Sequence, residues 1–338
     1  MTKILAVYDA DPVFAKRLAD YVNQKETGLF AAMAFSSLDR LKEYGDSHSI
    51  EILLVDERSR SAVGDVKAKQ IMVLNDGEIT EEKKARELIP VIYKFQSGDC
   101  IMREVLASYC GCSLEPALAF MGARATVMGV YSPINRCQKS ALALVIAQLL
   151  SREELVLYLN LEEYSGFSRL ICSEYSWTLS DVLYLYQQGQ YNWVKLKSMI
   201  SNWGNMDYIP PVRYGEDLSQ VDPEDMAHLI DRIAREGGYK KIVVDVGQMG
   251  RGALSLLSIC DAVYMPVKDD LVSMAKLEEF EEYLGEADQT DVKGRIQRLK
   301  LPENRTVLRG ENYMEQLLWG ELGDYVRRLL NGGRPKQL

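Results

Sequence analysis

The stretch that decides the fold covers residues 125–140 and reads ATVMGVYSPINRCQKS. Its first part is apolar and rich in β-branched residues, which is typical of a buried strand. A loop follows, and Lys139 and Ser140 then open an apolar helix that extends to residue 150. A strand, a loop and a Lys-Ser pair at the start of a helix form the layout of a loop that binds nucleotide phosphates.

A phosphate-binding loop acts mainly through its backbone. Consecutive N–H groups and the N-terminus of the following helix surround the phosphate oxygens. Lys139 would add a positive charge, and the Ser140 hydroxyl would ligate Mg²⁺. We therefore expect the cofactor contacts to come from a continuous run of residues, namely Ile134, Asn135, Arg136, Cys137, Gln138, Lys139 and Ser140.

The loop lacks the glycines that such loops usually contain. Asparagine tolerates a positive φ better than most residues, so Asn135 suits a position where glycine is wanted. Arg136 and Gln138 suit such a position less well. Taken alone, the loop also fits a purely structural turn between a strand and a helix, so the rest of the chain has to decide between the two interpretations.

Length and composition limit the remaining possibilities. The chain has 338 residues, more than one ordinary core accommodates, so we expect two domains. It carries 40 basic and 49 acidic residues, a net charge of −9, which argues against binding nucleic acid. The sequence has neither an uninterrupted apolar run long enough to span a membrane nor the layout of a signal peptide. We therefore expect a cytoplasmic protein with reduced cysteines.

Strand and helix patterns alternate along the whole chain, which indicates α/β architecture with parallel sheets covered on both faces. In the first part we expect five strands, at 4–8, 29–35, 51–55, 71–74 and 91–93, with helices at 14–22, 38–44, 81–88 and 99–109. In the second part we expect strands at 125–131, 155–159, 241–244, 262–266 and near Val307, with helices at 140–150, 179–186, 191–200, 222–236, 272–284 and 320–330.

The break in this alternation predicts the domain boundaries. Residues 110–118 read CGCSLEPAL and fit neither a strand nor a helix of the pattern. We predict a first domain over residues 1–110, a linker over 111–123 and a larger doubly wound domain over 124–338. The first domain is expected to have a flavodoxin-like five-stranded sheet, because its strands alternate with helices along the chain.

Five polar side chains of the first domain follow its strands, where the ligand sites of parallel sheets lie. They are Asp9, Asp11, Asp56, Asn75 and Lys94. This pattern resembles the receiver domain of bacterial response regulators. The resemblance implies that Asp9 is a metal ligand, that Asp56 accepts phosphate and that Lys94 pairs with it; Asp11 is a further candidate ligand if it turns inward.

Three positions depart from the receiver pattern. Ala10 stands where receivers carry a second acidic residue, Asn75 replaces a hydroxyl, and Phe95 replaces the usual proline. The first domain therefore resembles an atypical receiver, and we expect a domain that serves packing and partner contacts. A working phosphorylation switch at Asp56 is the alternative.

The second domain resembles the MinD/ParA family of P-loop ATPases. Ser132 and Pro133 match that family's loop, and Ile134 stands in place of its signature lysine. Residues 160–166, NLEEYSG, resemble the first switch segment, and residues 242–247, IVVDVG, resemble the second. The order of these segments along the chain is that of the family.

This resemblance implies a role for four further residues. Glu162 stands at the position of the aspartate that orients the attacking water, which makes it the candidate catalytic residue. Asp245 would hold the Mg²⁺ shell, and the Gly247 amide would contact the γ-phosphate. Pro266 ends a strand beside the expected position of the base.

An atypical receiver joined to an atypical MinD-like domain resembles the TadZ/CpaE family of tight-adherence (Flp) pilus assembly. The resemblance implies a homodimer that binds ATP and Mg²⁺, hydrolyses ATP weakly or not at all, and recruits pilus and secretion assembly proteins at the cell pole. It implies at most a peripheral association with the membrane. The alternative is a phosphorylation-gated response regulator with an inert ATPase-like output domain.

Overall fold

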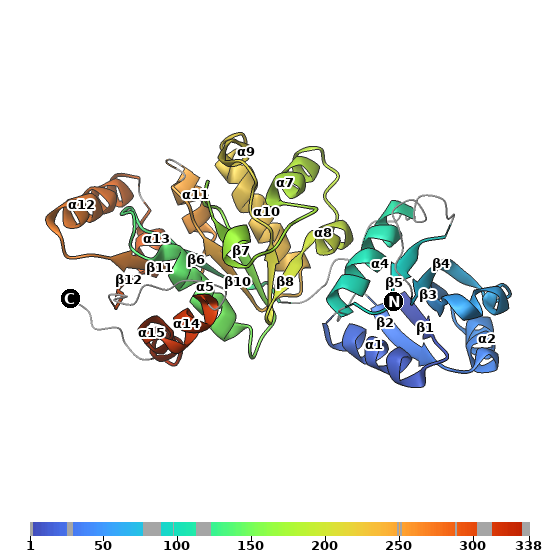
Figure 1. Ribbon diagram of the computed structural model, residues 1–338. Coiled ribbons are helices and arrows are strands. Elements are labelled where there is room, and N and C mark those ends of the chain that lie inside the picture. The colour runs from blue at the N-terminus through green and yellow to red at the C-terminus, as the bar shows by residue number, and fades with distance from the viewer. Residues whose placement is uncertain are drawn as a thin grey trace. The chain divides into compact units, whose positions relative to one another are not determined.

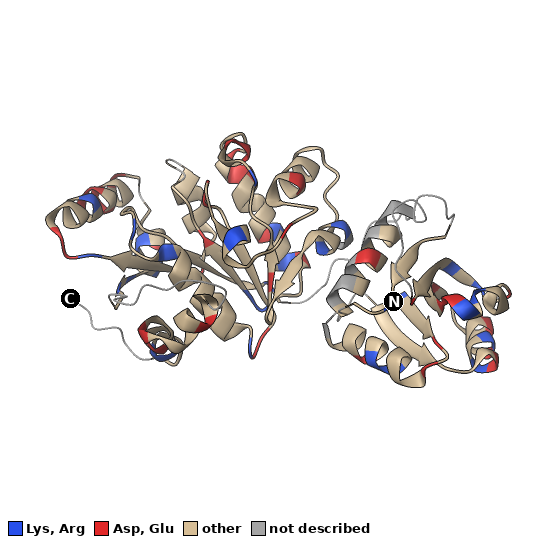
Figure 2. Ribbon diagram, viewed as in Figure 1, with Lys and Arg blue, Asp and Glu red and all other residues tan. Residues whose placement is uncertain are grey.

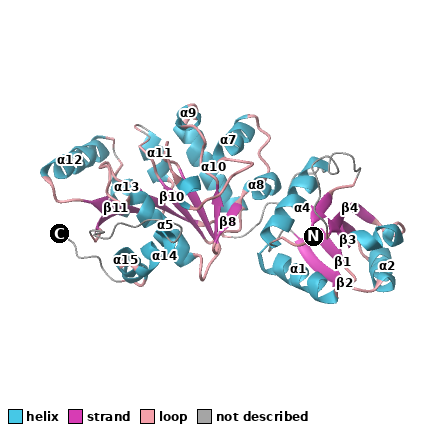
Figure 3. Ribbon diagram, in the orientation of Figure 1, coloured by secondary structure: helices cyan, strands magenta, loops and turns pink. Residues whose placement is uncertain are grey.

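The computed structural model describes residues 3–25, 30–76, 89–96, 98–112, 123–248, 250, 252–287, 289–302 and 313–332. The chain divides into two compact units, one formed by residues 1–120 with 192–198, the other by residues 121–191 with 199–338 (Figure 1). Each unit has a central sheet with helices around it (Figure 3), so the predicted α/β class is confirmed. Most of the predicted linker lies outside the described residues, and the boundaries at 110 and 123 stay a prediction.

The first unit contains a parallel sheet of five strands in the order β2-β1-β3-β4-β5. This is the order of flavodoxin-like folds, in which the ligand crevice lies between the first and third strands. The strands are β1 (Lys3–Tyr8), β2 (Phe30–Phe35), β3 (Ile50–Asp56), β4 (Ala68–Asn75) and β5 (Val91–Tyr93). All seven residues of the central strand β3 are buried, which explains why its sequence, IEILLVD, is almost continuously apolar.

Helices cover both faces of this sheet. Helix α1 (Pro12–Lys25) contacts α4 (Gly98–Cys112) on one face. On the other face, a second core includes Leu41 of α2 (Leu38–Ser47) and Val63 of the 3₁₀ helix η1 (Glu57–Val63). The predicted helix at 81–88 lies outside the described residues.

The second unit contains a sheet of seven strands in the order β12-β11-β6-β10-β7-β9-β8. Every neighbouring pair is parallel except β8 and β9. The strands are β6 (Thr126–Val130), β7 (Val156–Asn160), β8 (Ser201–Trp203), β9 (Met206–Ile209), β10 (Lys241–Asp245), β11 (Ala262–Val267) and β12 (Ile296–Lys300). The central position of β6 and β10 places the segments that follow them at the middle of the sheet's carboxyl edge.

Helices lie on both faces of the larger sheet as well. Figure 1 shows α10 (Pro223–Glu236) and α11 (Gly252–Ser258) on one face and α5 (Lys139–Leu150), α14 (Tyr313–Trp319) and α15 (Glu321–Leu330) on the other. The remaining helices of this unit are α6 (Phe167–Leu170), α7 (Leu179–Gln187), α9 (Gly215–Ser219), α12 (Leu271–Glu286) and α13 (Thr290–Arg295). Helix α8 (Trp193–Met199) lies almost entirely in the segment 192–198, which belongs to the first unit. Basic and acidic residues are both scattered over the two units (Figure 2).

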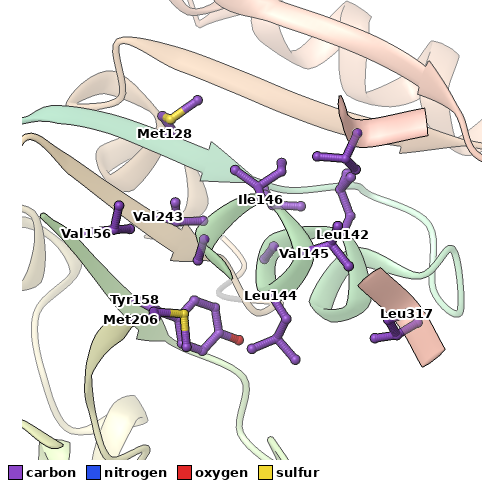
Figure 4. Packing of buried hydrophobic residues seen from close by; sticks show 14 of the residues in the cluster. Met128, Leu142, Leu144, Val145, Ile146, Val156, Tyr158, Met206, Val243 and Leu317 are labelled. Atoms are coloured by element: carbon purple, nitrogen blue, oxygen red, sulfur yellow. The ribbon is translucent and has the colours of Figure 1, made fainter. Parts of the chain in front are cut away.

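The main core of the second unit lies between this sheet and α5. Leu142, Val145 and Ile146 of α5 pack against β-strand residues that include Val156 and Val243 (Figure 4). Seven consecutive residues of α5, from Leu142 to Gln148, are buried, so this helix is apolar nearly all round. The buried residues that follow Lys139 thus fix the position of the N-terminus of α5.

Some elements differ from the sequence prediction. The predicted strand near Val307 lies outside the described residues, and the edge strand that pairs with β11 is β12. The hairpin of β8 and β9 was not predicted, because its strands are short and only β9 is fully buried. Helix α14 was not predicted either.

The C-terminal helix α15 packs on its own unit. Leu322 and Val326 are buried against the core that α5 forms, and the charged face of α15 points outward. None of the described helices is long and apolar enough to cross a membrane.

Candidate functional site

The loop between β6 and α5 has an alternating backbone. Arg136 and Gln138 have positive φ values of 54° and 65°, whereas Asn135 and Cys137 do not. Alternation of right-handed and left-handed residues turns successive N–H groups toward one side and forms an anion-binding concavity. The two residues judged less suited to a positive φ, Arg136 and Gln138, are thus the ones that adopt it, and Asn135 does not.

Buried side chains hold this loop in place. Ile134 and Cys137 are only 2% and 4% exposed, and both contribute to the core. The Ser132 hydroxyl donates to the Pro266 carbonyl at 2.7 Å, and the Gln138 side-chain amide donates to the Pro302 carbonyl at 3.2 Å. The loop is thus fixed by packing and side-chain hydrogen bonds, where glycine-rich loops rely on backbone freedom.

A cavity of about 820 Å³ opens above the loop. Its lining consists of the loop residues from Asn135 to Ala141 together with Glu162, Tyr313 and Leu317. Ile134 and Cys137 are buried, and the residues at the glycine positions, Asn135, Arg136 and Gln138, line the open space. Burial also raises the pKa of the Cys137 thiol, which favours its neutral form over a reactive thiolate.

Lys139 is the main cation of this cavity and is almost fully buried. Its ammonium group lies 3.0 Å from the Glu162 carboxylate and donates to the Val246 carbonyl at 3.2 Å. Glu162 is positioned by a hydrogen bond from its backbone N–H to the Asn160 side-chain oxygen, at 2.9 Å. The structure therefore brings together the predicted phosphate-binding lysine and the predicted catalytic glutamate.

Asp245 lies at the end of β10, in register with Val130 of β6 and Asn160 of β7. It is completely buried. One carboxylate oxygen accepts hydrogen bonds from the Asn160 amide at 3.1 Å and the Tyr158 hydroxyl at 3.3 Å. The other makes no hydrogen bond of ordinary geometry with the described residues, although the Ser140 hydroxyl interacts with the carboxyl group. Burial, which is the largest cause, raises the pKa of Asp245 to about 6, and the negative charge of Glu162 acts in the same direction, whereas the interaction with Ser140 lowers the pKa.

Gly247 lies where the two switch segments meet. A Cβ atom at this position would collide with the carbonyl oxygen of Leu161, so only glycine allows this approach. The Leu161 N–H in turn donates to the Asp245 carbonyl at 2.9 Å. Next to them, the Gln248 amide donates to the Asn135 side-chain oxygen at 2.6 Å, which links the second switch segment to the loop.

Pro266 lies within β11 rather than at its end. The pairing of β11 with β6 stops at Tyr264, so the missing N–H of the proline does not interrupt a ladder hydrogen bond to β6. Its carbonyl accepts a hydrogen bond from the Ser132 hydroxyl, so Pro266 helps to hold the loop between β6 and α5 in place.

The sequence prediction missed the buried groups that surround Asp245. Tyr158 and Asn160 are two residues apart on β7, so both side chains point to one face of the strand, and the Asn160 amide also donates to the Tyr158 hydroxyl at 2.9 Å. A polar residue at every second position of a buried strand is the signal that would have indicated them. No comparable sequence pattern indicates that Tyr313 and Leu317 line the cavity.

The donor groups present fit a nucleotide with magnesium. Within the described ranges, no group of three or more His, Cys, Asp and Glu side chains could hold a metal ion by itself. Mg²⁺ bound with few protein ligands, together with substrate phosphates and water, is the usual arrangement at phosphate-binding loops. The unpartnered oxygen of Asp245 and the Ser140 hydroxyl are the groups that would hold it, and the ion would neutralise phosphate charge there.

Three of the residues predicted to form the pocket of the first unit also lie together, with a lysine at the centre. The Lys94 ammonium lies 2.6 Å from the Asp9 carboxylate and 3.7 Å from that of Asp56, and all three side chains are buried. It also lies 4.6 Å from the centre of the Phe14 ring. The ammonium group thus occupies the space between the two carboxylates.

Two other predicted residues lie apart from this cluster. The Asp11 carboxylate accepts the backbone N–H of Val13 at 2.9 Å, and so caps the start of α1. The Asn75 amide donates to the Glu57 carboxylate. Neither side chain is free to complete a metal or phosphate site with Asp9 and Asp56.

Comparisons with known proteins add a general similarity of fold. No family model and no curated protein matches the chain. Among solved structures, a ParA family ATPase from Chlorobium tepidum is similar over 63% of this chain and 90% of its own, with 18% identity and a TM-score of 0.45. A plasmid partition protein from Borrelia burgdorferi bound to AMPPNP is similar over 64% and 92%, with 16% identity and a TM-score of 0.42.

A third solved structure has a different activity. Cobyrinic acid a,c-diamide synthase from Mycobacterium smegmatis, with an ATP analogue and magnesium, is similar over 57% of this chain and 78% of its own, with 14% identity and a TM-score of 0.42. At these identities and scores, the similarities establish neither a family nor a function for the chain.

Replacing Lys94 tests whether the first unit depends on its buried ion cluster. Lys94→Ala leaves two carboxylates buried without a cation, so we expect it to lower the free energy of unfolding by about 3–5 kcal/mol. Lys42→Ala is the control, because it removes an exposed ion pair with Asp65 and should cost less than about 1 kcal/mol. Urea denaturation of the full chain, followed by circular dichroism, measures both. Equal effects would contradict a structural role for Lys94.

The raised pKa of Asp245 predicts a pH dependence in the absence of metal. A carboxyl group whose pKa is about 6 in the folded chain and 3.8 otherwise binds its proton more tightly when folded. Its contribution to stability is therefore greatest below pH 3.8 and is lost as the pH rises through 6. Asp245→Asn removes this dependence, so the variant should gain about 2–3 kcal/mol relative to wild type between pH 4 and 7.

Unfolding free energies of both proteins across this pH range, measured with a chelator present, check the prediction. Asp65→Asn is the control, because Asp65 is exposed. A difference between Asp245→Asn and wild type that stays constant with pH would mean that the buried carboxyl group does not titrate as expected.

Proposed function

We propose that the second unit binds ATP with Mg²⁺ and that the protein acts as a nucleotide-controlled scaffold. The observation that carries the proposal is the alternating loop at the start of α5, with buried Lys139 beneath an open cavity of about 820 Å³. The unpartnered oxygen of Asp245 supports the magnesium part of the proposal. In this arrangement Ile134, Asn135, Arg136, Cys137, Gln138 and Gly247 supply backbone contacts, and Ser140 and Asp245 lie on the magnesium side.

We further propose weak or absent hydrolysis. Ile134, at the position of the signature lysine, is buried in the core and has no charge to offer to a transition state. Glu162 is paired with Lys139, so its carboxylate has to leave that ion pair before it can orient a water molecule. Slow turnover suits a protein whose bound nucleotide controls assembly.

The finer parts of the proposal come from the resemblance to the TadZ/CpaE family. They are a homodimer, pilus and secretion assembly proteins as partners, a cytoplasmic location at the cell pole and, at most, peripheral membrane association. The pairing of a receiver-like unit with a unit that carries a phosphate-binding loop supports them. A dimer that forms only with nucleotide would be stabilised by mass action, which makes nucleotide the natural control of assembly.

A phosphorylation-gated response regulator is the second candidate. The proximity of Lys94 to Asp56 favours it. The shorter contact of Lys94 with Asp9, and the engagement of Asn75 with Glu57, oppose it, because a phosphoryl group at Asp56 would have to displace both.

A thermal shift experiment tests ATP binding. With ATP and Mg²⁺ at about one hundred times the dissociation constant, binding should add about 2.7 kcal/mol and raise the melting temperature by several degrees. Lys139→Ala should lose most of this rise, because it removes the phosphate-binding cation. Lys276→Ala, an exposed lysine of α12, should keep it. A wild-type protein without any rise would contradict the proposal.

A second variant tests the ion pair between Lys139 and Glu162. Glu162→Gln removes the negative charge that competes with phosphate for Lys139, so ATP should bind about three- to tenfold more tightly. Glu163→Gln, an exposed neighbour without an ion pair among the described residues, should leave affinity unchanged. Isothermal titration calorimetry measures both. Weaker binding to Glu162→Gln would show instead that the carboxylate helps to hold the bound nucleotide.

A further inference from the structure

The cavity above the loop has two walls of different chemistry. One wall is the polar loop with the Lys139–Glu162 pair. The other consists of Tyr313 and Leu317, which lie one helical turn apart on α14 and so share one face of that helix. A ligand that fills the cavity therefore meets charged and hydrogen-bonding groups at one side and an aromatic ring at the other.

Helix α14 is firmly attached to the rest of the unit. Leu317 is 2% exposed and belongs to the same core as Leu142 and Leu144 of α5 (Figure 4). The Arg327 guanidinium of α15 donates to the Leu318 carbonyl at 2.7 Å, which ties the end of α14 to the next helix. The wall that α14 contributes is thus a fixed surface, and Tyr313 is held half-buried at its edge.

The direction of the loop orients a nucleotide relative to this wall. Lys139 and Ser140 are the groups suited to the terminal phosphates, and the same cavity is also lined by Ala141 of α5 and by Tyr313 and Leu317 of α14. A nucleoside triphosphate with its phosphates on the loop therefore has its base on the side of Tyr313. A base is planar and stacks on aromatic side chains, whereas the loop side offers no exposed ring.

We propose that Tyr313 is the residue that contacts the base of the bound nucleotide, by stacking of its ring, with Leu317 as the apolar surface beneath. The inference rests on the proposed ATP binding and adds to it the source of affinity for the nucleoside part. Stacking does not distinguish purines strongly, so the affinities of the chain for ATP and for GTP should depend on Tyr313 to a similar extent.

Comparison of ATP with inorganic tripolyphosphate, each with Mg²⁺, tests this inference, because tripolyphosphate has the phosphates without the base. The affinities of the full-length chain are measured by calorimetry for wild type, Tyr313→Phe, Tyr313→Leu and Tyr313→Ala. We expect Tyr313→Leu and Tyr313→Ala to bind ATP about tenfold more weakly and tripolyphosphate as wild type does. Tyr313→Phe keeps the ring and should bind both ligands normally.

The control is Tyr325→Ala, because Tyr325 is a half-buried tyrosine of the neighbouring helix α15 that does not line the cavity. It should leave both affinities unchanged, and the melting temperature of each variant shows that it is folded. Tyr313→Leu fills part of the space of the ring, so it keeps the test valid if Tyr313→Ala does not fold.

The possible results separate the inference from the proposed function. Unchanged ATP affinity in Tyr313→Leu, or equal losses for ATP and tripolyphosphate, would overturn the stacking role while leaving ATP binding intact. If tripolyphosphate binds too weakly to measure, equal losses of ATP affinity in Tyr313→Phe and Tyr313→Leu would overturn it. A wild-type chain that binds neither ligand would contradict the proposed function and this inference together.

Discussion

The burial of Ile134 and Cys137 is the constraint on which the candidate site depends. The left-handed conformations of Arg136 and Gln138 each cost about 1–3 kcal/mol in residues that carry a Cβ atom. Burial of one isoleucine side chain stabilises by about 1.5–3 kcal/mol, so the two buried anchors and the Ser132 hydrogen bond can offset that cost. A loop that has lost its glycines keeps the curved backbone because two of its side chains, those of Ile134 and Cys137, have become part of the core.

The charges around this loop explain why the site suits an anion only together with a cation. Lys139 already pairs with Glu162, and Asp245 adds a second carboxyl group that burial makes costly to ionise. A polyphosphate would bring further negative charge to these two acids. A divalent ion beside Asp245 would resolve the conflict, since it would offer a ligand position to the carboxylate and neutralise the phosphates.

Much of the fold could be predicted from the sequence, because buried parallel strands such as β3 and β10 are apolar runs that need no context to identify. The resemblance to the MinD/ParA family implied one site for Lys139, Glu162 and Asp245, and the neighbouring strands β6, β10 and β7 carry the segments to which they belong. The prediction failed for the backbone conformation of the loop. It judged which residues suit a positive φ from their intrinsic preference, whereas the packing of neighbouring side chains determines which residues adopt it. Tyr313 lies far along the chain from the loop, and only tertiary packing brings it to the cavity.

The two units use the same edge of a parallel sheet in opposite ways. In the first, Lys94 places its ammonium between Asp9 and Asp56, so the protein's own cation occupies the space between the two carboxylates. In the second, Lys139 leaves an oxygen of Asp245 unpartnered and a cavity open. A ligand of the first crevice would have to displace Lys94, whereas a ligand of the second unit can enter a cavity that is already open. This difference favours the second unit as the one that responds to a ligand and the first as a constant surface.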